Sequence, residues 1–379
     1  MKTRVLIAGI STRAIAESAA RAAFDVTAID AFGDLDQHSS VQARSLGDRF
    51  SPDAAVNEAR SIACDAVAYG SNFENHSDLV GELARGRTLW GNPGDVIRRV
   101  RDPLILSEAL RRRGFAVPDC RLSTDDSRLP TLDSRRRWLA KPLASGGGHH
   151  VRAWSPGTHL PAGCYLQELV DGTSGSVALV AAGRRAVPIG LSRQLIGDKA
   201  FGASGYRYSG NILVPAGDDG AVTASARALV SAIAEEFDLV GVNGVDFVAR
   251  EGVPYAVEVN PRWSASMELV ERAYGLSVFA AHAAACRDGV LPDFDLTAAW
   301  RGPRVVGKAV VFARRHVTVG DTRAWLEHGD VRDVPHPNTR ILAGRPVCTV
   351  FAAGRDADEC YAGLVGRAER IYSELVAML

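Results

Sequence analysis

Residues 255–262 constrain the fold more than any other stretch of the chain, because they have the pattern of a strand that stops at a proline. They read YAVEVNPR, with side chains that alternate with a period of two. This period places Glu258 and Asn260 on one face of the strand, about 7 Å apart. Two oxygen-bearing side chains on one face, with Arg262 just beyond them, suit a hard divalent cation that holds a phosphate.

A second strand is expected just upstream, at residues 244–249, with a turn at residues 250–252. Such a hairpin brings Asp246 beside Glu258 and gives the same region two carboxylates. An ordinary β-hairpin with a solvated polar face explains this pattern equally well. Metal binding at the hairpin therefore depends on an independent sign that the chain binds a phosphate.

Evidence for a phosphate site is found directly after the strand expected at residues 138–142. This strand carries Lys141 near its end. The next segment, residues 143–150, contains three consecutive glycines, whose backbone can approach a ligand closely and direct N–H groups at it. Together with the fixed positive charge of Lys141, this segment suits the triphosphate of ATP. It is not a P-loop, because the lysine precedes the glycines. A flexible hairpin that binds nothing is the alternative.

The N-terminal sequence predicts a parallel α/β unit. Residues 4–9 and 24–29 have the pattern of buried strands, and an alanine-rich helix at residues 14–23 connects them. Ligands of such sheets bind beyond the carboxyl ends of the strands. The loop after the strand expected at residues 65–69 is therefore a candidate substrate site, although an Asx turn is an equally common role for such a loop. Its candidate residues are Ser71, Asn72 and Glu74.

A glycine-rich and aromatic segment at residues 192–211 has no clear periodicity and is long for a connection. Such segments are often functional or mobile, so Arg193 and Gln194 are further candidates for substrate contact. An amphipathic helix expected at residues 221–237 follows the segment and leads into the hairpin.

The composition limits the partners of the chain. Among 379 residues, 44 are basic and 44 are acidic, so the net charge of zero gives no support for binding to nucleic acid or to a membrane surface. The six cysteines include no C-x-x-C pair, which argues against a zinc site or a disulfide framework. No apolar run is long enough to span a membrane, and no signal-peptide pattern is present. We expect a cytoplasmic protein of two or three domains.

Three stretches in a fixed order resemble the ATP-grasp superfamily of ATP-dependent carboxylate ligases. They are residues 140–142 with the glycine segment, residues 167–172 and residues 244–262. Each stretch is weak by itself, but the ordered set is specific, and it covers roughly residues 100–290. The tail around residues 344–350 is similar to the C-terminal domain of biotin carboxylase relatives.

Two further stretches, residues 69–74 and 89–92, look like those of a narrower group. Its members are ATP-dependent ligases associated with tetrahydromethanopterin- and methylofuran-dependent one-carbon metabolism. This likeness implies amide formation with glutamate in the biosynthesis of a one-carbon cofactor.

The superfamily resemblance implies an α/β and α+β chain with the ATP-grasp fold. A Rossmann-like N-terminal domain with a parallel βαβ sheet is expected at residues 1–100, and the ATP-grasp domain at residues 101–295. Within the latter, a lid subdomain is expected at about residues 120–190. A small C-terminal α+β domain, like that of biotin carboxylase, is expected at residues 296–379.

The same resemblance implies roles for individual residues. Lys141 contacts the α- and β-phosphates of ATP, Arg262 stabilises the transferring phosphoryl group, and these two are the expected catalytic residues. The loop over the triphosphate consists of Ser145, Gly146, Gly147 and Gly148. The segment at the adenine consists of Gln167, Glu168 and Leu169. Two Mg²⁺ ions, for which Mn²⁺ can substitute, bridge the β- and γ-phosphates, and their ligands are Asp246, Glu258 and Asn260.

Two positions depart from the superfamily pattern. Pro103 follows Asp102 where the first nucleotide-contacting basic residue is usual, which leaves Arg101 or Arg99 to replace it. Ser174 stands where an acidic residue usually meets the ribose. The residues that contact the ribose therefore stay open.

The implied reaction is a two-step ligation. A small-molecule carboxylate attacks the γ-phosphate of ATP and forms an acyl phosphate and ADP, and an amine then displaces the phosphate. A homodimer is compatible with this activity. Two alternatives stay open: a bicarbonate-activating enzyme related to carboxylases, and a nucleotide-binding regulatory protein without turnover.

Overall fold

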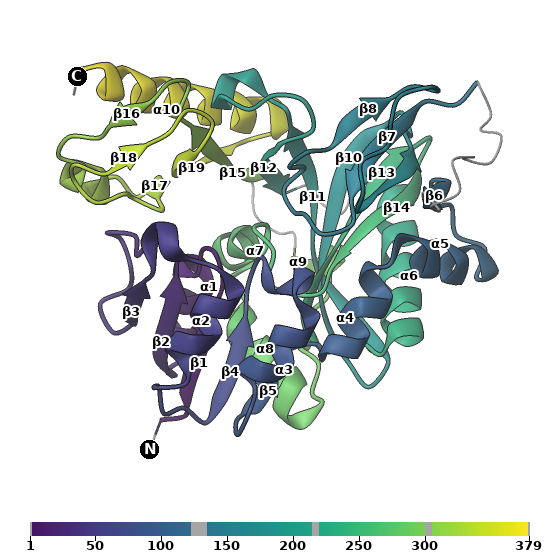
Figure 1. Ribbon diagram of the computed structural model, residues 1–379, viewed down its shortest axis with the longest axis horizontal. Helices are drawn as coiled ribbons and strands as arrows, with labels where there is room; N and C mark the ends of the chain where they lie inside the picture. The colour runs from purple at the N-terminus through teal and green to yellow at the C-terminus, as the bar shows by residue number, and fades with distance from the viewer. Residues whose placement is uncertain (1, 123–134, 214–219, 300–304, 378–379) are drawn as a thin grey trace.

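The computed structural model describes residues 2–122, 135–213, 220–299 and 305–377. Within these ranges the strands form a parallel sheet, a large antiparallel sheet, a four-stranded sheet and a two-stranded ribbon. In Figure 1 the parallel sheet lies at the lower left, the large sheet crosses the middle and the four-stranded sheet lies at the upper right. This architecture confirms the expected α/β and α+β class.

The parallel sheet has the strand order β3-β2-β1-β4-β5. β1 (Arg4–Ala8) pairs in parallel with both β2 (Asp25–Asp30) and β4 (Ala66–Tyr69), as the predicted βαβ unit requires. The strand order reverses between β1 and β4, so the loops after these strands open the crevice where ligands of such sheets bind. The other elements here are β3 (Gln42–Ser45), β5 (Thr88–Trp90), α1 (Arg13–Arg21), α2 (Pro52–Ala59), α3 (Ser77–Leu83), α4 (Gly94–Arg101) and the 3₁₀ turns η1 (Gly47–Arg49) and η2 (Phe73–Asn75).

Strand β1 shows why this sheet forms. Val5 and Ile7 belong to one apolar cluster, whereas Leu6 and Ala8 belong to another. Alternate residues of a strand face opposite sides of the sheet, so both faces of β1 are buried. A continuous apolar run buried on both faces is typical of a parallel strand between two helical layers.

The large sheet has the order β14-β13-β10-β11-β12-β15-β19-β17, with antiparallel pairing throughout. Gly210 of β12 lies opposite Ala309 of β15, and this pairing joins the C-terminal strands to those of the middle of the chain. The strands are β10 (Thr173–Ala182), β11 (Arg185–Ile196), β12 (Tyr208–Leu213), β13 (Gly241–Arg250), β14 (Val253–Asn260), β15 (Val305–Phe312), β17 (Val331–Arg332) and β19 (Pro346–Gly354). The remaining elements of these parts are α6 (Gly220–Phe237), α7 (Met267–Tyr274), α8 (Val278–Asp288), α9 (Leu296–Ala299), α10 (Ala357–Ala377), η3 (Lys199–Phe201), η4 (Arg323–Glu327) and the ribbon of β16 (Val317–Thr318) and β18 (Arg340–Ile341).

The four-stranded sheet follows α5 (Pro103–Arg112) and has the order β6-β9-β7-β8. The last residue of this sheet is Glu168. The lid was expected to extend to about residue 190, but β10 and β11, which follow the sheet, pair within the large sheet. Its strands are β6 (Cys120–Leu122), β7 (Trp138–Pro142), β8 (Arg152–Trp154) and β9 (Cys164–Glu168).

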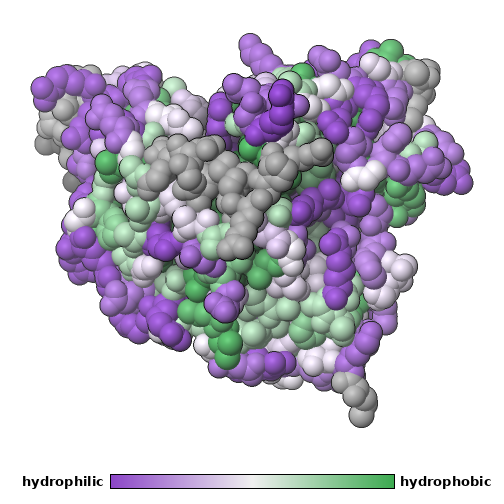
Figure 2. Space-filling view, turned by 180° about the vertical axis from the view of Figure 1, so that it is seen from behind, coloured by the Kyte–Doolittle hydropathy of each residue, from purple (hydrophilic) through white to green (hydrophobic). Residues whose placement is uncertain are grey.

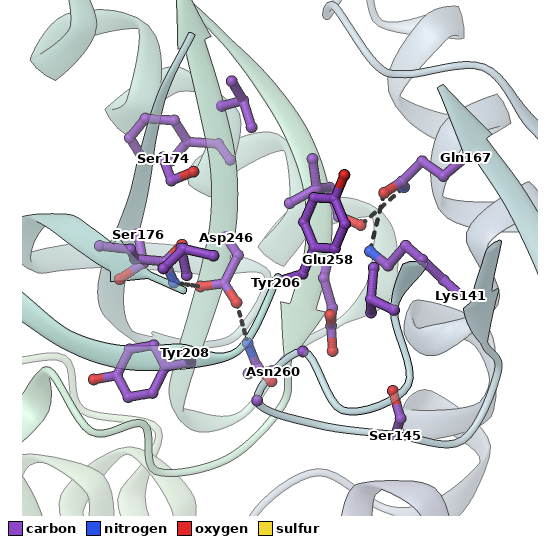
Figure 3. Close-up of a pocket in the computed structure, with 18 of the residues that line it drawn as sticks. Lys141, Ser145, Gln167, Ser174, Ser176, Tyr206, Tyr208, Asp246, Glu258 and Asn260 are labelled. Atoms are coloured by element: carbon purple, nitrogen blue, oxygen red, sulfur yellow. Dashed lines mark hydrogen bonds between the residues drawn. The ribbon is translucent and has the colours of Figure 1, made fainter. Parts of the chain in front are cut away.

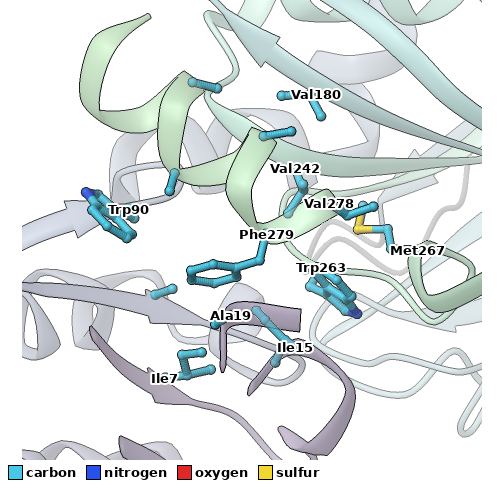
Figure 4. Packing of buried hydrophobic residues seen from close by; sticks show 14 of the residues in the cluster. Ile7, Ile15, Ala19, Trp90, Val180, Val242, Trp263, Met267, Val278 and Phe279 are labelled. Carbon is cyan, nitrogen blue, oxygen red and sulfur yellow. The ribbon is translucent and has the colours of Figure 1, made fainter. Parts of the chain in front are cut away.

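Helix α8 packs between the parallel sheet and the large sheet (Figure 4). The ring centroid of Phe279, on α8, lies 5.5 Å from that of Phe24 and 6.2 Å from that of Trp90. Val180 and Val242 of the large sheet belong to the same buried cluster. This shared core fixes the loop after β4 relative to the β13–β14 hairpin.

Figure 2 shows the face opposite to that in Figure 1, where hydrophilic residues are widely spread and hydrophobic residues gather mainly in the lower half. Exposed ion pairs such as Arg98–Asp78 (2.8 Å) occur on the surface. None of the helices in the described part of the chain is both long and apolar enough to cross a membrane.

Candidate active site

A cavity of about 560 Å³ lies between the four-stranded sheet, the large sheet and the loop after β4. Figure 3 shows Lys141 and Gln167 on one side of it, Asp246 and Tyr208 on the other, and Glu258 between them. A volume of this size is typical of small-molecule sites in proteins.

The predicted hairpin forms one wall of the cavity. β13 pairs with β14, and Asp246 lies opposite Glu258, as predicted. The turn residues Glu251 and Gly252 have φ angles of 53° and 79°. Two positive φ angles are the mark of a type I′ turn, whose twist matches that of the flanking strands.

The strict alternation predicted over residues 255–260 is wrong at Val257. On β13, Phe247 lies opposite Ala256 of β14, and Asp246 lies opposite Glu258. Val257, between these two residues of β14, therefore has no opposite residue. This is a β-bulge, which bends the strand and re-aims the side chains beside it. Ala256 consequently faces the apolar core, whereas Val257 and Glu258 both line the cavity.

Asp246 is held by two side-chain amides. It accepts hydrogen bonds from Gln194 Nε2 (3.0 Å) and Asn260 Nδ2 (2.9 Å), one at each carboxylate oxygen. Burial raises the pKa of Asp246, and the negative charge of Glu258 adds to this effect, so that the pKa reaches about 7. A cation beside Asp246 would favour its ionised form.

The surroundings of Glu258 favour its ionised form, unlike those of Asp246. It forms an ion pair with Arg101, whose side chain is 10% exposed. Burial raises the pKa of Glu258, but the positive charges of Arg101, Lys141 and Arg262 together outweigh burial and hold this pKa below its usual range. Glu258 is therefore an ionised carboxylate among three cations.

Of the two arginines that the sequence left open, Arg101 lines the cavity. Its Nη2 donates hydrogen bonds to the backbone carbonyl of Ser145 (3.0 Å) and to Asn75 Oδ1 (3.1 Å). Arg99 instead lies over the ring of Phe237, 5.5 Å from its centroid. The geometry therefore selects Arg101 as the basic residue that faces the site.

The start of α5 explains why the usual basic position is not basic here. Asp102 accepts hydrogen bonds from the backbone N–H groups of Leu104 (2.8 Å) and Ile105 (3.0 Å), and Pro103 occupies the first turn. Both residues are favoured where a helix begins. Pro103 thus serves the start of the helix, and the positive charge that faces the cavity comes from Arg101, the residue before Asp102.

Lys141 stands on β7, facing the hairpin. Its Nζ donates a hydrogen bond to Gln167 Oε1 (2.9 Å) and lies 5.8 Å from the ring centroid of Tyr165. Burial lowers the pKa of Lys141, but its interactions with Tyr165 and Glu258 outweigh burial and hold the pKa above its usual value. Gln167 Nε2 also donates to the carbonyl of the bulge residue Val257 (3.2 Å), which ties the four-stranded sheet to the hairpin.

Arg262 forms an ion pair with Glu74 of the loop after β4. Glu74 Oε1 lies 2.8 Å from Arg262 Nε and 2.6 Å from Nη2, and the two side chains are 1% and 10% exposed. Nη2 also donates to Asn260 Oδ1 (3.1 Å), and Tyr69 Oη donates to the carbonyl of Pro261 (3.1 Å). These contacts join the N-terminal part of the chain to the end of β14.

The glycine loop is held against the segment that precedes β12. Gly147 and Gly148 have φ angles of 60° and 73°. A Cβ atom at Gly148 would lie 1.8 Å from the carbonyl oxygen of Tyr206, and the backbone N–H of Tyr208 donates to the carbonyl of Gly147 (3.0 Å). Both the positive φ and the close approach require glycine at position 148.

We expect Gly148→Ala to displace the loop and to weaken ATP binding about tenfold, because the added methyl group meets Tyr206 and a side chain at positive φ costs about 1–2 kcal/mol. Gly157→Ala is the matched control, since Gly157 has a φ of 84° but a Cβ there would meet nothing within 4 Å. Calorimetric titration with ATP and Mg²⁺ measures both affinities. Equal affinities of the two variants would contradict a role of this loop in nucleotide binding.

Most of the predicted site residues gather at the cavity. Those that line it are Ser71, Lys141, Ser145, Gly147, Gly148, Gln167, Leu169, Gln194, Asp246, Glu258, Asn260 and Arg262. Glu74 joins the group through Arg262. Gly146 lies against Glu74, since a Cβ at Gly146 would be 3.9 Å from Glu74 Oε1.

Three predicted residues are directed elsewhere. Glu168 forms an ion pair with Arg136 (2.9 Å), as expected for the neighbour of a cavity-facing residue on a strand. Arg193 is exposed for the same reason, because the residue next to it on β11 lines the cavity. Asn72 has a φ of 88° and accepts a hydrogen bond from Asn75 Nδ2 (3.4 Å), so it shapes the turn after β4.

Several lining residues were not predicted. They bring aromatic rings and polar groups from segments far from the hairpin in sequence, and they are Tyr165, Ser176, Tyr206, Tyr208 and Asn211. The aromatic composition of residues 192–211 was the signal available for part of this set. Strand pairing, which the sequence does not specify, brings them to the cavity.

Comparison with known proteins finds a match for the part of the chain that supplies most of this site. Residues 100–266 match a family model described as the ATP-grasp domain. An uncharacterized protein of Methanocaldococcus jannaschii, MJ0776, is 20% identical over 372 residues, which cover 92% of this chain and 88% of that protein.

Solved structures extend the likeness to nearly the whole chain. The L-amino acid ligase from Bacillus licheniformis superposes with a TM-score of 0.73 at 14% identity, covering 97% of each chain. An N5-carboxyaminoimidazole ribonucleotide synthetase in complex with ADP gives 0.71 at 17% identity, covering 98% of this chain and 97% of that one. Biotin carboxylase from Campylobacter jejuni gives 0.70 at 12% identity, covering 96% and 90%. The chain therefore has the ATP-grasp fold, with an ATP-grasp domain at residues 100–266.

Proposed function

We propose that the chain is an ATP- and Mg²⁺-dependent ligase that activates a carboxylate as an acyl phosphate and joins it to an amine. What supports this function is the gathering of Lys141, Asp246, Glu258 and Arg262 around one cavity that residues of the glycine loop also line. Figure 3 shows the first three of these residues. Such a set offsets the charge of a triphosphate and positions its terminal phosphoryl group, which is how phosphoryl transfer is mainly catalysed.

The carboxylate pair fits the proposed magnesium site. Asp246 and Glu258 lie opposite each other, and the N–H donors now bonded to them belong to Gln194, Asn260 and Arg101. Mg²⁺ is commonly held by one or two carboxylates together with substrate phosphates and water. In the described part of the chain no cluster of three His, Cys, Asp or Glu side chains is placed to hold a metal by itself, so the phosphates would have to supply further ligands. Two Mg²⁺ ions bound here would supply positive charge to the β- and γ-phosphates.

The basic side chains have separate tasks in this proposal. Lys141 and Arg101 bind the phosphates, since both are positive and line the cavity under the glycine loop. Arg262 lies beside the loop after β4, where the carboxylate substrate enters, and it binds the phosphoryl group during transfer. The glycine loop excludes water that would hydrolyse the acyl phosphate.

The nucleoside occupies the more apolar part of the cavity. Leu139, Leu169 and Phe247 line this part and offer flat apolar contacts to an adenine ring. Ser174 also lines the cavity, and its hydroxyl takes the place of the acidic residue that usually meets the ribose.

Glutamate is the first carboxylate to test, and precursors of one-carbon cofactors are the first amines, on the likeness carried by residues 69–74 and 89–92. In the structure both stretches support the end of β14. Tyr69 Oη and Asn92 Nδ2 each donate a hydrogen bond to the carbonyl of Pro261, both at 3.1 Å. They thereby position Arg262. These contacts do not indicate a particular substrate, so the choice of glutamate and of the amines rests on the sequence likeness.

ADP formation from ATP and Mg²⁺ with a panel of carboxylates tests the proposal, with hydroxylamine as the nucleophile. Hydroxylamine converts an acyl phosphate into a hydroxamate, so we expect equal amounts of ADP and hydroxamate that depend on one of the carboxylates. ADP release that depends on bicarbonate alone would instead favour a carboxylase-like reaction. Nucleotide binding without ADP release from any carboxylate would contradict catalytic turnover.

A further inference from the structure

Glu74 has one carboxylate oxygen that Arg262 does not occupy. Oε1 receives both hydrogen bonds from Arg262, whereas Oε2 is buried and has no hydrogen-bond partner among the residues that the structure describes. An ionised carboxylate accepts at both oxygens, and a buried acceptor without a partner costs about 1–3 kcal/mol. Buried polar atoms without partners are rare in native proteins and call for a specific cause.

The position of Glu74 places this oxygen at the meeting point of the two proposed half-reactions. Glu74 lies in η2, directly after β4, where the strand order of the parallel sheet reverses. Its neighbour Asn75 accepts a hydrogen bond from Arg101, which also pairs with Glu258. Gly146 of the glycine loop lies near Glu74, since a Cβ there would be 3.9 Å from Oε1. The carboxylate thus lies between the groups assigned to the phosphates and the sheet edge where substrates enter.

The charges around Glu74 favour a cationic partner for Oε2. Arg262 is shared between Glu74 and Asn260, and in the proposed reaction it also binds the phosphoryl group. The charge of Arg101 also interacts with Glu74, but neither arginine donates a hydrogen bond to Oε2, so a protonated amine would give this oxygen a positive partner of its own. An anion such as bicarbonate would add negative charge beside it, which a buried site of this kind disfavours.

We propose that Glu74 Oε2 binds the nitrogen of the amine substrate beside the acyl phosphate and accepts one of its protons. This inference rests on the ligase function proposed above. The protonated amine gives one proton to Glu74, and its freed lone pair attacks the acyl carbon. The C–N bond forms while the C–O bond to phosphate breaks. The phosphate leaves with the electron pair and takes a second proton from the nitrogen, and Glu74 returns its proton to solvent.

The glycine loop lies next to this carboxylate, since a Cβ at Gly146 would be 3.9 Å from Glu74 Oε1. With the loop in this position, the amine and the acyl phosphate would be held together without water.

The test compares two nucleophiles in Glu74→Gln, a variant that keeps the shape of the side chain and an oxygen for Arg262. Hydroxylamine is largely uncharged at neutral pH and needs no base, whereas ammonium must lose a proton before it attacks. We expect the ratio of the rate of primary amide formation from ammonium to the hydroxamate rate to fall about 10²-fold or more, because both reactions share any disturbance of Arg262 and only the ammonium reaction needs the base. Glu74→Asp, which keeps the carboxylate, should restore part of the ammonium reaction.

Equal losses with both nucleophiles would show that Glu74 only holds Arg262 and would overturn the inference. Unchanged rates with both, or an unaltered protein that uses hydroxylamine but not ammonium, would overturn it as well. If the unaltered protein forms no hydroxamate from any carboxylate, the ligase function itself fails, which separates the two failures. Calorimetric titration with ATP and Mg²⁺ checks that Glu74→Gln still binds nucleotide and is folded.

Discussion

Glu258→Gln should lower carboxylate-dependent ADP formation about 10³-fold or more, because a neutral amide cannot supply the negative charge that the proposed metal site needs. Glu258 is the ionised member of the carboxylate pair, among three cations. Its loss also leaves Arg101 without its ion-pair partner. We expect the fold to survive, because the substitution also removes the repulsion between Glu258 and Asp246.

Glu251→Gln is the matched control for this change. Glu251 lies in the turn of the same hairpin, is exposed and makes no contact with the cavity. ADP release from each variant, together with thermal unfolding by circular dichroism, separates loss of catalysis from loss of folding. Near-normal turnover in Glu258→Gln would contradict the assignment of Glu258 as a metal ligand.

Arg262→Met should have the second largest effect, on both activity and stability. We expect ADP formation to fall about 10²–10³-fold, since the charge at the transferring phosphoryl group is lost. We also expect the free energy of unfolding to drop by about 3 kcal/mol, because Glu74 stays buried without its cation. Urea unfolding measures the second effect. Arg98→Met, which breaks the exposed pair with Asp78, should change stability by no more than about 1 kcal/mol.

A double variant separates the two contributions of Arg262. Combining Arg262→Met with Glu74→Met replaces a buried ion pair by apolar side chains of similar size, which is often neutral for stability. We expect the double variant to regain most of the lost stability but none of the ADP formation measured with hydroxylamine, a nucleophile that does not need Glu74. Recovery of activity along with stability would mean that Arg262 acts only by supporting the fold.

The local chemistry of this site could be predicted from the sequence. Two short apolar strands around a glycine-containing turn indicate the hairpin and predict that Asp246 and Glu258 lie near each other. Their direct pairing depends on the bulge, because a regular register from this turn would place Asp246 opposite Val257. The glycine loop after Lys141 is equally local, since three glycines and a lysine lie within eight residues. Such features depend only on residues that are close together in the sequence, so they can be recognised from a single sequence.

Contacts between distant segments could not be predicted in the same way. The sequence left Arg99 and Arg101 equivalent, and only the packing of α4 decides which one faces Glu258. The ion pair of Arg262 with Glu74 joins residues 188 positions apart. The bulge at Val257 was missed because an apolar residue there satisfies the period of two whether or not the strand is regular.

The pairing of β12 with β15 has a consequence for any shortened form of the chain. A chain cut before Val305 would leave β12 as an open edge, with unpaired N–H and C=O groups along a buried strand. Open edges of this kind recruit strands from other molecules and lead to aggregation. In this chain the sheet instead runs on to β17, whose two residues make a poor template for further pairing. The C-terminal segment thus covers one edge of the large sheet, while β14 forms the other edge.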